Sequence, residues 1–392
     1  MHDGAVEDTR GDGRSRTLER WVPGVLAARS YERSWLARDL VAAIVLSALL
    51  VPQGMAYAEL AGLPAITGLY TTVACLVAYA VFGPSPYLVL GPDSSLGPII
   101  AAIILPLAAG SMDAAVGLAG MLALLVGAIC IGAGAARLGF ISDLLSQPVR
   151  LGYMAGLAVT IVVGQLPDLF GFDTEGGNIV DEARDFLAGL DETNRYALAI
   201  GLLALAIIMG LRRWRPRVPG ILVAVVVTLG LSAVLDLAAR GVEVVGVLPQ
   251  GFPRPSLPDV ELADLPLLIG GAIGITLVAI GDTVSVSAGF AAKRGRDVDT
   301  DQEIVAIGSA NVAAGLFSGF PVSTSSSRTA VADQAGAKSQ LTGLAAAGLV
   351  LAMLLFMYHT VVHDTWNWEL LSIGITMAVA KVSLMAWYRF KD

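Results

Sequence analysis

Two short segments of the chain each combine a glycine–proline break with a run of hydroxyl side chains. Residues 90–95 read LGPDSS, residues 319–328 read GFPVSTSSSR, and each adjoins a long apolar stretch. Proline suits the first turn of a helix and Ser, Thr and Asp suit its N-cap, so each segment predicts the start of a helix. The first amides of a helix and its dipole attract anions. The two segments are therefore candidate elements of an anion-binding site.

Three ionisable residues lie in or near these apolar stretches. Arg328 ends the second segment, and a lone charged arginine among apolar residues indicates a functional site. Asp282 interrupts another apolar run, where it either balances Arg328 in a fixed ion pair or takes up a coupling proton or sodium ion. Asp93 is first a helix cap and only second a coupling or substrate residue. An unpaired carboxylate at that position would repel an anion.

The same residues argue against an enzyme. The histidines, His2, His359 and His363, are distant in sequence from the serine run, so a Ser-His-Asp site is not expected. The chain has no Gly-Lys-Ser/Thr motif, which argues against nucleotide hydrolysis. His359 and His363 lie four residues apart beside Asp364 but lack a third convincing ligand. We therefore expect no enzyme activity, no cofactor and no metal site.

The composition is that of a membrane protein. Of the 392 residues, 55% are hydrophobic and 15% are charged, and the mean hydropathy is +0.72. Soluble domains are about 45–50% apolar and about 25% charged, so an ordinary soluble protein is excluded. High hydrophobicity also excludes a disordered chain. The net charge of −8 argues against nucleic acid as a partner.

Uncharged apolar blocks divide the chain into roughly eleven or twelve membrane-entering segments. The clearest blocks are 40–58, 60–92, 94–112, 114–136, 151–167, 196–211, 218–235, 265–281, 304–327, 341–357 and 370–388. Both breaks lie at membrane depth, where irregular backbone is tolerated only inside protein or along a cavity. Two breaks in corresponding halves predict a transporter with inverted repeats, whose half-helices meet at the midplane. The alternative is two kinked spans.

Loop charges predict the orientation. Arginines crowd residues 10–38 and 212–217, and basic residues follow at 293–296, whereas the intervening loops at 168–192 and 236–264 are acidic. Positive loops stay in the cytoplasm, so we expect a multi-pass protein of the plasma membrane with a cytoplasmic N-terminus. The excess of arginine over lysine is typical of a bacterial sequence and favours the bacterial inner membrane. Aromatic residues among the first arginines favour a helix on the membrane surface, with a solvated lead-in as the alternative.

Several motifs resemble the signature of the SulP anion permeases, the bacterial relatives of solute carrier family 26. Residues 52–64 read PQGMAYAELAGLP and residues 68–70 read GLY. In the second half, residues 320–330 and 335–343 match further motifs of that family. The resemblance covers about residues 20 to 356. After Phe356, no counterpart can be matched, and we expect a divergent tail with an incomplete gate domain.

The resemblance implies an all-α polytopic fold with two inverted repeats, a core domain and a gate domain. The expected division is a cytoplasmic segment 1–38, core 39–139, gate 140–265, core 266–356 and a tail 357–392. An anion would sit between the two half-helices. The residues that the resemblance places at the substrate are Gln53, Tyr57, Ser94, Ser95, Leu96, Ser326, Ser327 and Arg328. Asp282 matches the position of a coupling carboxylate.

The expected function is secondary active transport of small inorganic or organic anions, with sulfate first. Bicarbonate, chloride and dicarboxylates stay open, because helix dipoles and one arginine select charge better than shape. A proton or sodium ion, the lipid bilayer and a second copy in a homodimer are the expected partners. Two alternatives remain: a nucleobase permease of the same architecture, and a truncated, non-transporting membrane subunit.

Overall fold

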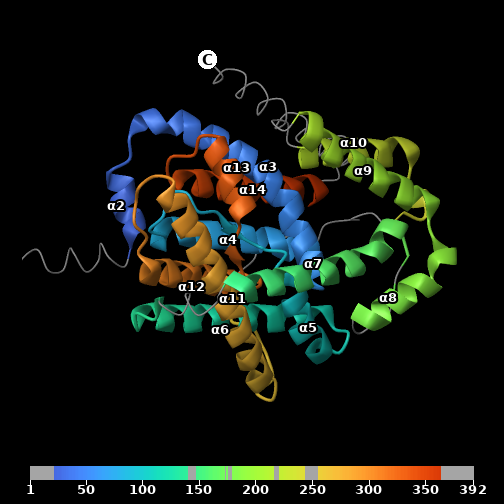
Figure 1. Ribbon diagram of the computed structural model, residues 1–392, viewed down its shortest axis with the longest axis horizontal. Helices are drawn as coiled ribbons and strands as arrows, with labels where there is room; N and C mark the ends of the chain where they lie inside the picture. The colour runs from blue at the N-terminus through green and yellow to red at the C-terminus, as the bar shows by residue number, and fades with distance from the viewer. Residues whose placement is uncertain are drawn as a thin grey trace, which may run out of the picture. The chain divides into compact units, whose positions relative to one another are not determined.

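The computed structural model describes residues 22–139, 147–172, 174, 179–215, 220–242 and 255–362 (Figure 1). The expectations for the first 21 residues and for the tail beyond residue 362, including His363 and Asp364, lie outside this part. The chain divides into two compact units. Unit 1 comprises Met1–Leu144 with Pro253–Leu351, and unit 2 comprises Leu145–Phe252 with Ala352–Asp392.

Unit 1 repeats one order of elements twice. Each half has a long helix, a second helix, a two-residue strand that leads into a short helix, and a final long helix. The first half contains α3 (Leu36–Leu60), α4 (Ala65–Phe82), β1 (Leu90–Gly91), α5 (Gly97–Ala108) and α6 (Met112–Ala135). The second contains α11 (Leu265–Ala292), α12 (Thr300–Leu316), β2 (Ser323–Thr324), α13 (Ser326–Gln334) and the first part of α14 (Leu341–Val362), which belongs to unit 1 as far as Leu351. The strands pair antiparallel, so the two halves enter the pair from opposite directions.

Local sequence explains where these helices begin. The hydroxyl of Ser111 accepts a hydrogen bond from the amide of Ala114 and caps α6. Asp299 does the same for α12 through the amide of Gln302. The short helix α2 (Pro23–Arg29) precedes α3 and packs against α4, where a Cβ on Gly24 would collide with the carbonyl oxygen of Ala80.

Glycines bring the helices of unit 1 into close contact. Gly120 and Gly127 of α6 face Gly315 and Gly308 of α12, so the two helices run antiparallel. A Cβ on Gly315 would lie 2.5 Å from the carbonyl oxygen of Gly120. Such small residues let backbones approach in a membrane, where packing replaces the hydrophobic effect between helices. Figure 1 shows α6 and α12 side by side.

Unit 2 contains α7 (Gln147–Phe170), α8 (Ile179–Ala188), α9 (Arg195–Trp214) and α10 (Gly220–Leu235). Asn194 organises the start of α9. Its side-chain oxygen accepts from the amides of Tyr196 and Ala197, and its amide nitrogen donates to the carbonyls of Arg240 and Gly241.

Within the described residues, five helices are long and apolar enough to cross a membrane. They are Arg33–Leu60 (which includes a short 3-10 turn before α3), Ala65–Phe82, Met112–Ala135, Arg195–Trp214 and Leu265–Ala292. In the same part of the chain, three further apolar helices are shorter, at Gly97–Ala108, Val223–Ser232 and Leu341–Leu355. The predicted break at residues 90–95 accounts for the short α5, because the chain is extended up to Gly91 before the helix begins.

Candidate anion-binding site

The two predicted breaks meet in unit 1 through the strands β1 and β2. Leu90 pairs with Thr324 and Gly91 pairs with Ser323, and all four residues are buried. The sequence pattern did not predict this strand pair, because two residues per strand carry no readable alternation. The pairing brings the starts of α5 and α13 together, although they are more than 220 residues apart in sequence.

The start of α5 is held by Asp93. Its Oδ1 accepts hydrogen bonds from the amide of Ser95 at 3.0 Å and from the hydroxyl of Ser95 at 2.7 Å. The backbone carbonyl of Asp93 accepts from the amides of Leu96 and Gly97. Leu96 is the N-cap residue of α5 and its side chain is fully buried, so it can offer a ligand only its backbone. Asp93 therefore caps the turn before the helix rather than the helix itself.

The start of α13 is more open. Ser325 is the N-cap residue, and its hydroxyl accepts from the amide of Arg328 at 3.5 Å and contacts the hydroxyl of Ser327 at 3.0 Å. Ser326 and Ser327 follow in the first turn, and both are exposed. The first amides of a helix have no intrahelical acceptor, so this turn presents donors and hydroxyls to a ligand.

Arg328 is fully buried and ties the two helix starts together. Its Nη1 donates to the carbonyl of Pro92, and its Nη2 donates to the carbonyl of Gly91 at 3.3 Å. A Cβ on Gly91 would lie 3.1 Å from Nη1, so glycine leaves the room that the guanidinium needs. The Nη2 atom also lies 3.6 Å from Oδ2 of Asp93.

Asp282 was predicted either to balance Arg328 or to take up a coupling ion. The structure shows an ion pair between Arg328 and Asp93. Asp282 lies on α11, and its Oδ2 is 3.5 Å from the hydroxyl of Ser95. The position of Asp282 in the sequence does not tell which residues of other elements it contacts. The packing of α11 against α5 decides this. Asp93 is thus a carboxylate partner of Arg328.

The other predicted site residues come from α3. Tyr57 is partly buried and lies close to Ser94, Arg328 and Asp93. Gln53 is partly buried one turn earlier on the same helix. The structure thus gathers Tyr57, Ser94, Ser95, Arg328 and both aspartates around the two helix starts.

Buried polar side chains that the sequence analysis missed fix the lead-in to each strand. Asn311 accepts from the amide of Val322 at 2.9 Å and donates to its carbonyl at 3.2 Å. Gln340 donates to the carbonyls of Ser85 at 2.7 Å and Leu88 at 3.0 Å. Asn311 stands in a mostly apolar run, which is a sequence signal that could have identified it, whereas Gln340 stands among polar residues and gives no such signal.

Asp39, at the start of α3, was likewise missed. Its carboxylate is fully buried and receives the amide of Lys338 at 2.7 Å, the hydroxyl of Ser339 at 2.7 Å and that of Thr342 at 3.0 Å. The hydroxyl of Tyr31 also donates to it, and burial together with this negative charge raises the pKa of Tyr31. Asp39 therefore anchors the start of α14 to the first half of the unit.

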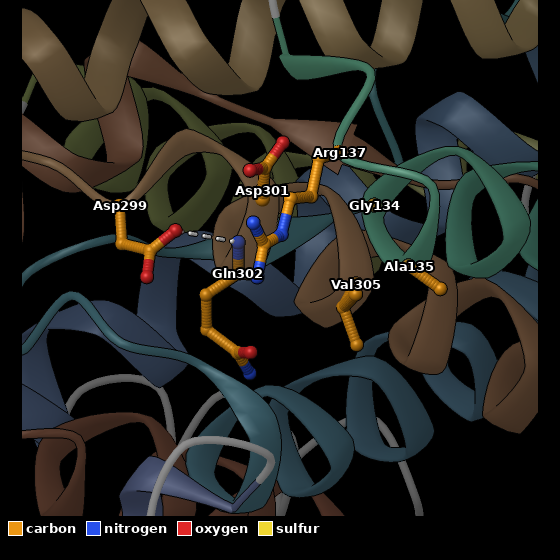
Figure 2. Close-up of a pocket in the computed structure, with 7 residues that line it drawn as sticks. All are labelled: Gly134, Ala135, Arg137, Asp299, Asp301, Gln302 and Val305. Carbon is orange, nitrogen blue, oxygen red and sulfur yellow. Dashed lines mark hydrogen bonds between the residues drawn. The ribbon is translucent and has the colours of Figure 1, made fainter.

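A hollow of about 140 Å³ lies elsewhere, between the end of α6 and the start of α12 (Figure 2). Asp299 and Asp301 line it, together with Arg137 and Gln302. Both carboxylates serve the backbone: Asp299 accepts from the amide of Gln302, and Asp301 accepts from the amide of Gly139 at 2.9 Å. Two carboxylates facing one arginine do not favour an anion, so we place the candidate site at the strand pair.

The fold and the site together define a class: an inverted-repeat membrane protein with a polar site between two half-helices. The sequence profile of the Sulfate permease family matches residues 36–388, and the chain belongs to this family. The match continues beyond Phe356, where the recognisable motifs end. The predicted family is confirmed.

Individual relatives agree with this assignment. A probable sulfate transporter of Mycobacterium tuberculosis is 44% identical over 340 residues, which are 87% of this chain and 61% of that protein. Prestin of Mus musculus is 30% identical over 368 residues, which are 86% of this chain and 48% of that protein. The chain thus spans about half to three fifths of the length of these curated relatives.

Solved structures share the fold. The structure of SLC26A9 superposes with a TM-score of 0.82 at 24% identity and covers 100% of this chain and 65% of its own. The transmembrane domain of the cyanobacterial bicarbonate transporter BicA gives a TM-score of 0.73 at 21% identity and covers 91% of this chain and 98% of its own. The prediction of an all-α polytopic transporter fold is confirmed.

Proposed function

We propose that this chain carries out secondary active transport of small anions across the bacterial plasma membrane, with sulfate as the most favoured substrate. One observation carries the proposal. Two helix starts from inverted halves converge at β1 and β2, with the charge of Arg328 beside them and the exposed hydroxyls of Ser326 and Ser327 on one of them. Dipoles, amides and a guanidinium together favour an anion.

The roles within the site follow from the contacts. Arg328 supplies positive charge and positions the two helix starts, because its donors are engaged by the carbonyls of Gly91 and Pro92. The hydroxyls of Ser326 and Ser327 are the groups that an anion reaches first. Ser94, Ser95 and the backbone of Leu96 would contribute from the other start, and Gln53 and Tyr57 would line the cavity.

We infer a core role for unit 1, which holds this site, and a gate role for unit 2. The division at Leu144, Pro253 and Leu351 supports core segments at 39–139 and 266–356 and a gate segment at 140–265. A cytoplasmic N-terminus and a homodimer belong to the same proposal. The arginine-rich segments 10–38 and 212–217 support the orientation.

Ligand binding tests the substrate. A ligand that binds only the folded state raises the melting temperature by mass action. We expect sulfate to stabilise the purified chain in detergent, and a variant with Ser326→Ala and Ser327→Ala to lose most of this stabilisation. The matched control carries Ser30→Ala and Ser34→Ala, which remove two exposed hydroxyls outside the site. The panel includes bicarbonate, chloride, dicarboxylates and uracil.

Each outcome of this panel has a meaning. Stabilisation by uracil alone would contradict the anion site and favour a nucleobase permease. No stabilisation by any ligand would contradict substrate binding and favour a non-transporting membrane subunit. Uptake of labelled sulfate into proteoliposomes then tests transport itself.

Coupling is the last part of the proposal. We assign the coupling proton or sodium ion to Asp282, because its carboxylate lies at the site, where its Oδ2 is 3.5 Å from the hydroxyl of Ser95. Asp282→Asn should abolish the dependence of sulfate uptake on a pH or sodium gradient. Full gradient dependence in that variant would contradict the assignment.

A further inference from the structure

We propose that Asp93 is a specificity-determining residue: it is the built-in counterion of Arg328 and weakens anion binding, most strongly for divalent anions. This inference rests on the proposed anion site. It gives Asp93 a role distinct from capping and from coupling, since its charge would act directly on the affinity of the site for its substrate.

The two oxygens of Asp93 have different tasks. Oδ1 accepts from the amide and hydroxyl of Ser95 and so holds the turn before α5. Oδ2 faces Nη2 of Arg328 at 3.6 Å. Holding the turn requires an acceptor but no charge, because an amide oxygen could accept the same two bonds. The negative charge of Asp93 therefore has no structural necessity in the turn.

The ion pair leaves the arginine incompletely satisfied. Charge-assisted bonds are about 2.7–2.9 Å long, and the distance of 3.6 Å is well beyond that range. Among the described residues, Nε of Arg328 is buried and has no hydrogen-bond partner. Two of its other donors are occupied by neutral carbonyls, which leave the guanidinium charged. The charge of Arg328 is thus available to a second anion, with Asp93 as the competitor.

The strength of this competition depends on the charge of the bound anion, because a second carboxylate, that of Asp282, also lies at the site. Asp282 approaches from α11 and contacts Ser95, so two carboxylates and one guanidinium surround the helix starts. Electrostatic repulsion is proportional to the product of the charges, so each carboxylate opposes sulfate about twice as strongly as chloride. Asp93 therefore lowers the preference of the site for divalent over monovalent anions.

Asp93→Asn separates the two tasks, since it keeps the acceptor for Ser95 and removes the charge facing Arg328. Isothermal titration of sulfate and of chloride into the purified chain, at one pH and constant ionic strength, measures both affinities. We expect the variant to bind sulfate about tenfold more tightly and chloride about threefold more tightly. The matched control is Asp333→Asn, which removes the partner of Arg294 from the same helix α13 as Arg328.

Two further variants guard against a structural effect. Asp93→Ser keeps a hydroxyl for the turn and should also gain affinity, and Asp93→Glu keeps the charge and should not. Unchanged or weaker sulfate binding in both neutral variants would overturn the inference, as would an equal gain for sulfate and chloride. The proposed function would survive either result if the wild-type chain bound sulfate. If neither the wild-type chain nor these variants bound any anion, both would fall.

Discussion

The starts of α5 and α13 share a place in the inverted repeat but differ in how their polar groups are used. At α5, Asp93 engages the amides of Ser95, Leu96 and Gly97 through its side chain or its carbonyl. At α13, the hydroxyls of Ser326 and Ser327 are exposed. The start of α5 is thus occupied by the carboxylate of Asp93, whereas the start of α13 is open to a ligand. Repeated topology therefore does not imply repeated chemistry.

The largest expected effect comes from releasing the strand that leads into α13. Asn311→Ala leaves the buried amide and carbonyl of Val322 without partners and removes a side chain that is fully buried. We expect a loss of about 2–4 kcal/mol in the free energy of unfolding, measured by denaturation in detergent. Ser309→Ala on the same helix is the control, because its hydroxyl bonds only the preceding turn. Equal losses in the two variants would contradict the bracing role of Asn311.

A smaller effect is expected at the point where the two starts touch. Gly91→Ala places a Cβ about 3.1 Å from Nη1 of Arg328, and the buried guanidinium must shift. We expect a destabilisation of about 1–3 kcal/mol, as for other overpacked sites. Gly274→Ala on α11 is the control, because a Cβ there meets nothing within 4 Å. A Gly91→Ala variant as stable as wild type would show that the guanidinium has room to move.

Two serines compare the starts directly. Ser95→Ala removes the hydroxyl that donates to Asp93 and lies near Asp282, and we expect it to cost about 1 kcal/mol of stability. The amide of Ser95 still donates to Asp93, so the turn should remain. Thermal unfolding of Ser95→Ala beside Ser325→Ala, the N-cap variant of α13, measures what each start contributes.

The smallest effect on stability is expected for Ser327→Ala. Its side chain is exposed, so the free energy of unfolding should change by less than about 0.5 kcal/mol. Sulfate binding should nevertheless weaken measurably in titration calorimetry, because the proposed site loses a hydroxyl donor. If Ser327→Ala lowered the stability but left sulfate binding intact, the hydroxyl of Ser327 would have a structural role and no role in binding, contrary to the proposal.

The sequence predicted the positions of both breaks and the residues around them well. Gly91, Pro92 and the serine run were recognisable because proline and small polar residues interrupt apolar blocks. The partner of Arg328 was not recognisable. Asp93 and Asp282 are both single carboxylates near apolar runs, and a sequence pattern does not tell which of them lies 3.6 Å from the guanidinium.

The apolar blocks, the arginine-rich segments and the two glycine–proline breaks are properties of the chain itself. They suffice for a polytopic membrane protein with two half-helices, because hydropathy and backbone preferences act locally. Three contacts join residues from separate elements or from opposite halves. They are the pairing of β1 with β2, the hydrogen bond from the amide of Val322 to the side chain of Asn311, and the ion pair between Asp93 and Arg328. Only the tertiary structure decided these contacts, because each depends on how separate helices and strands pack together.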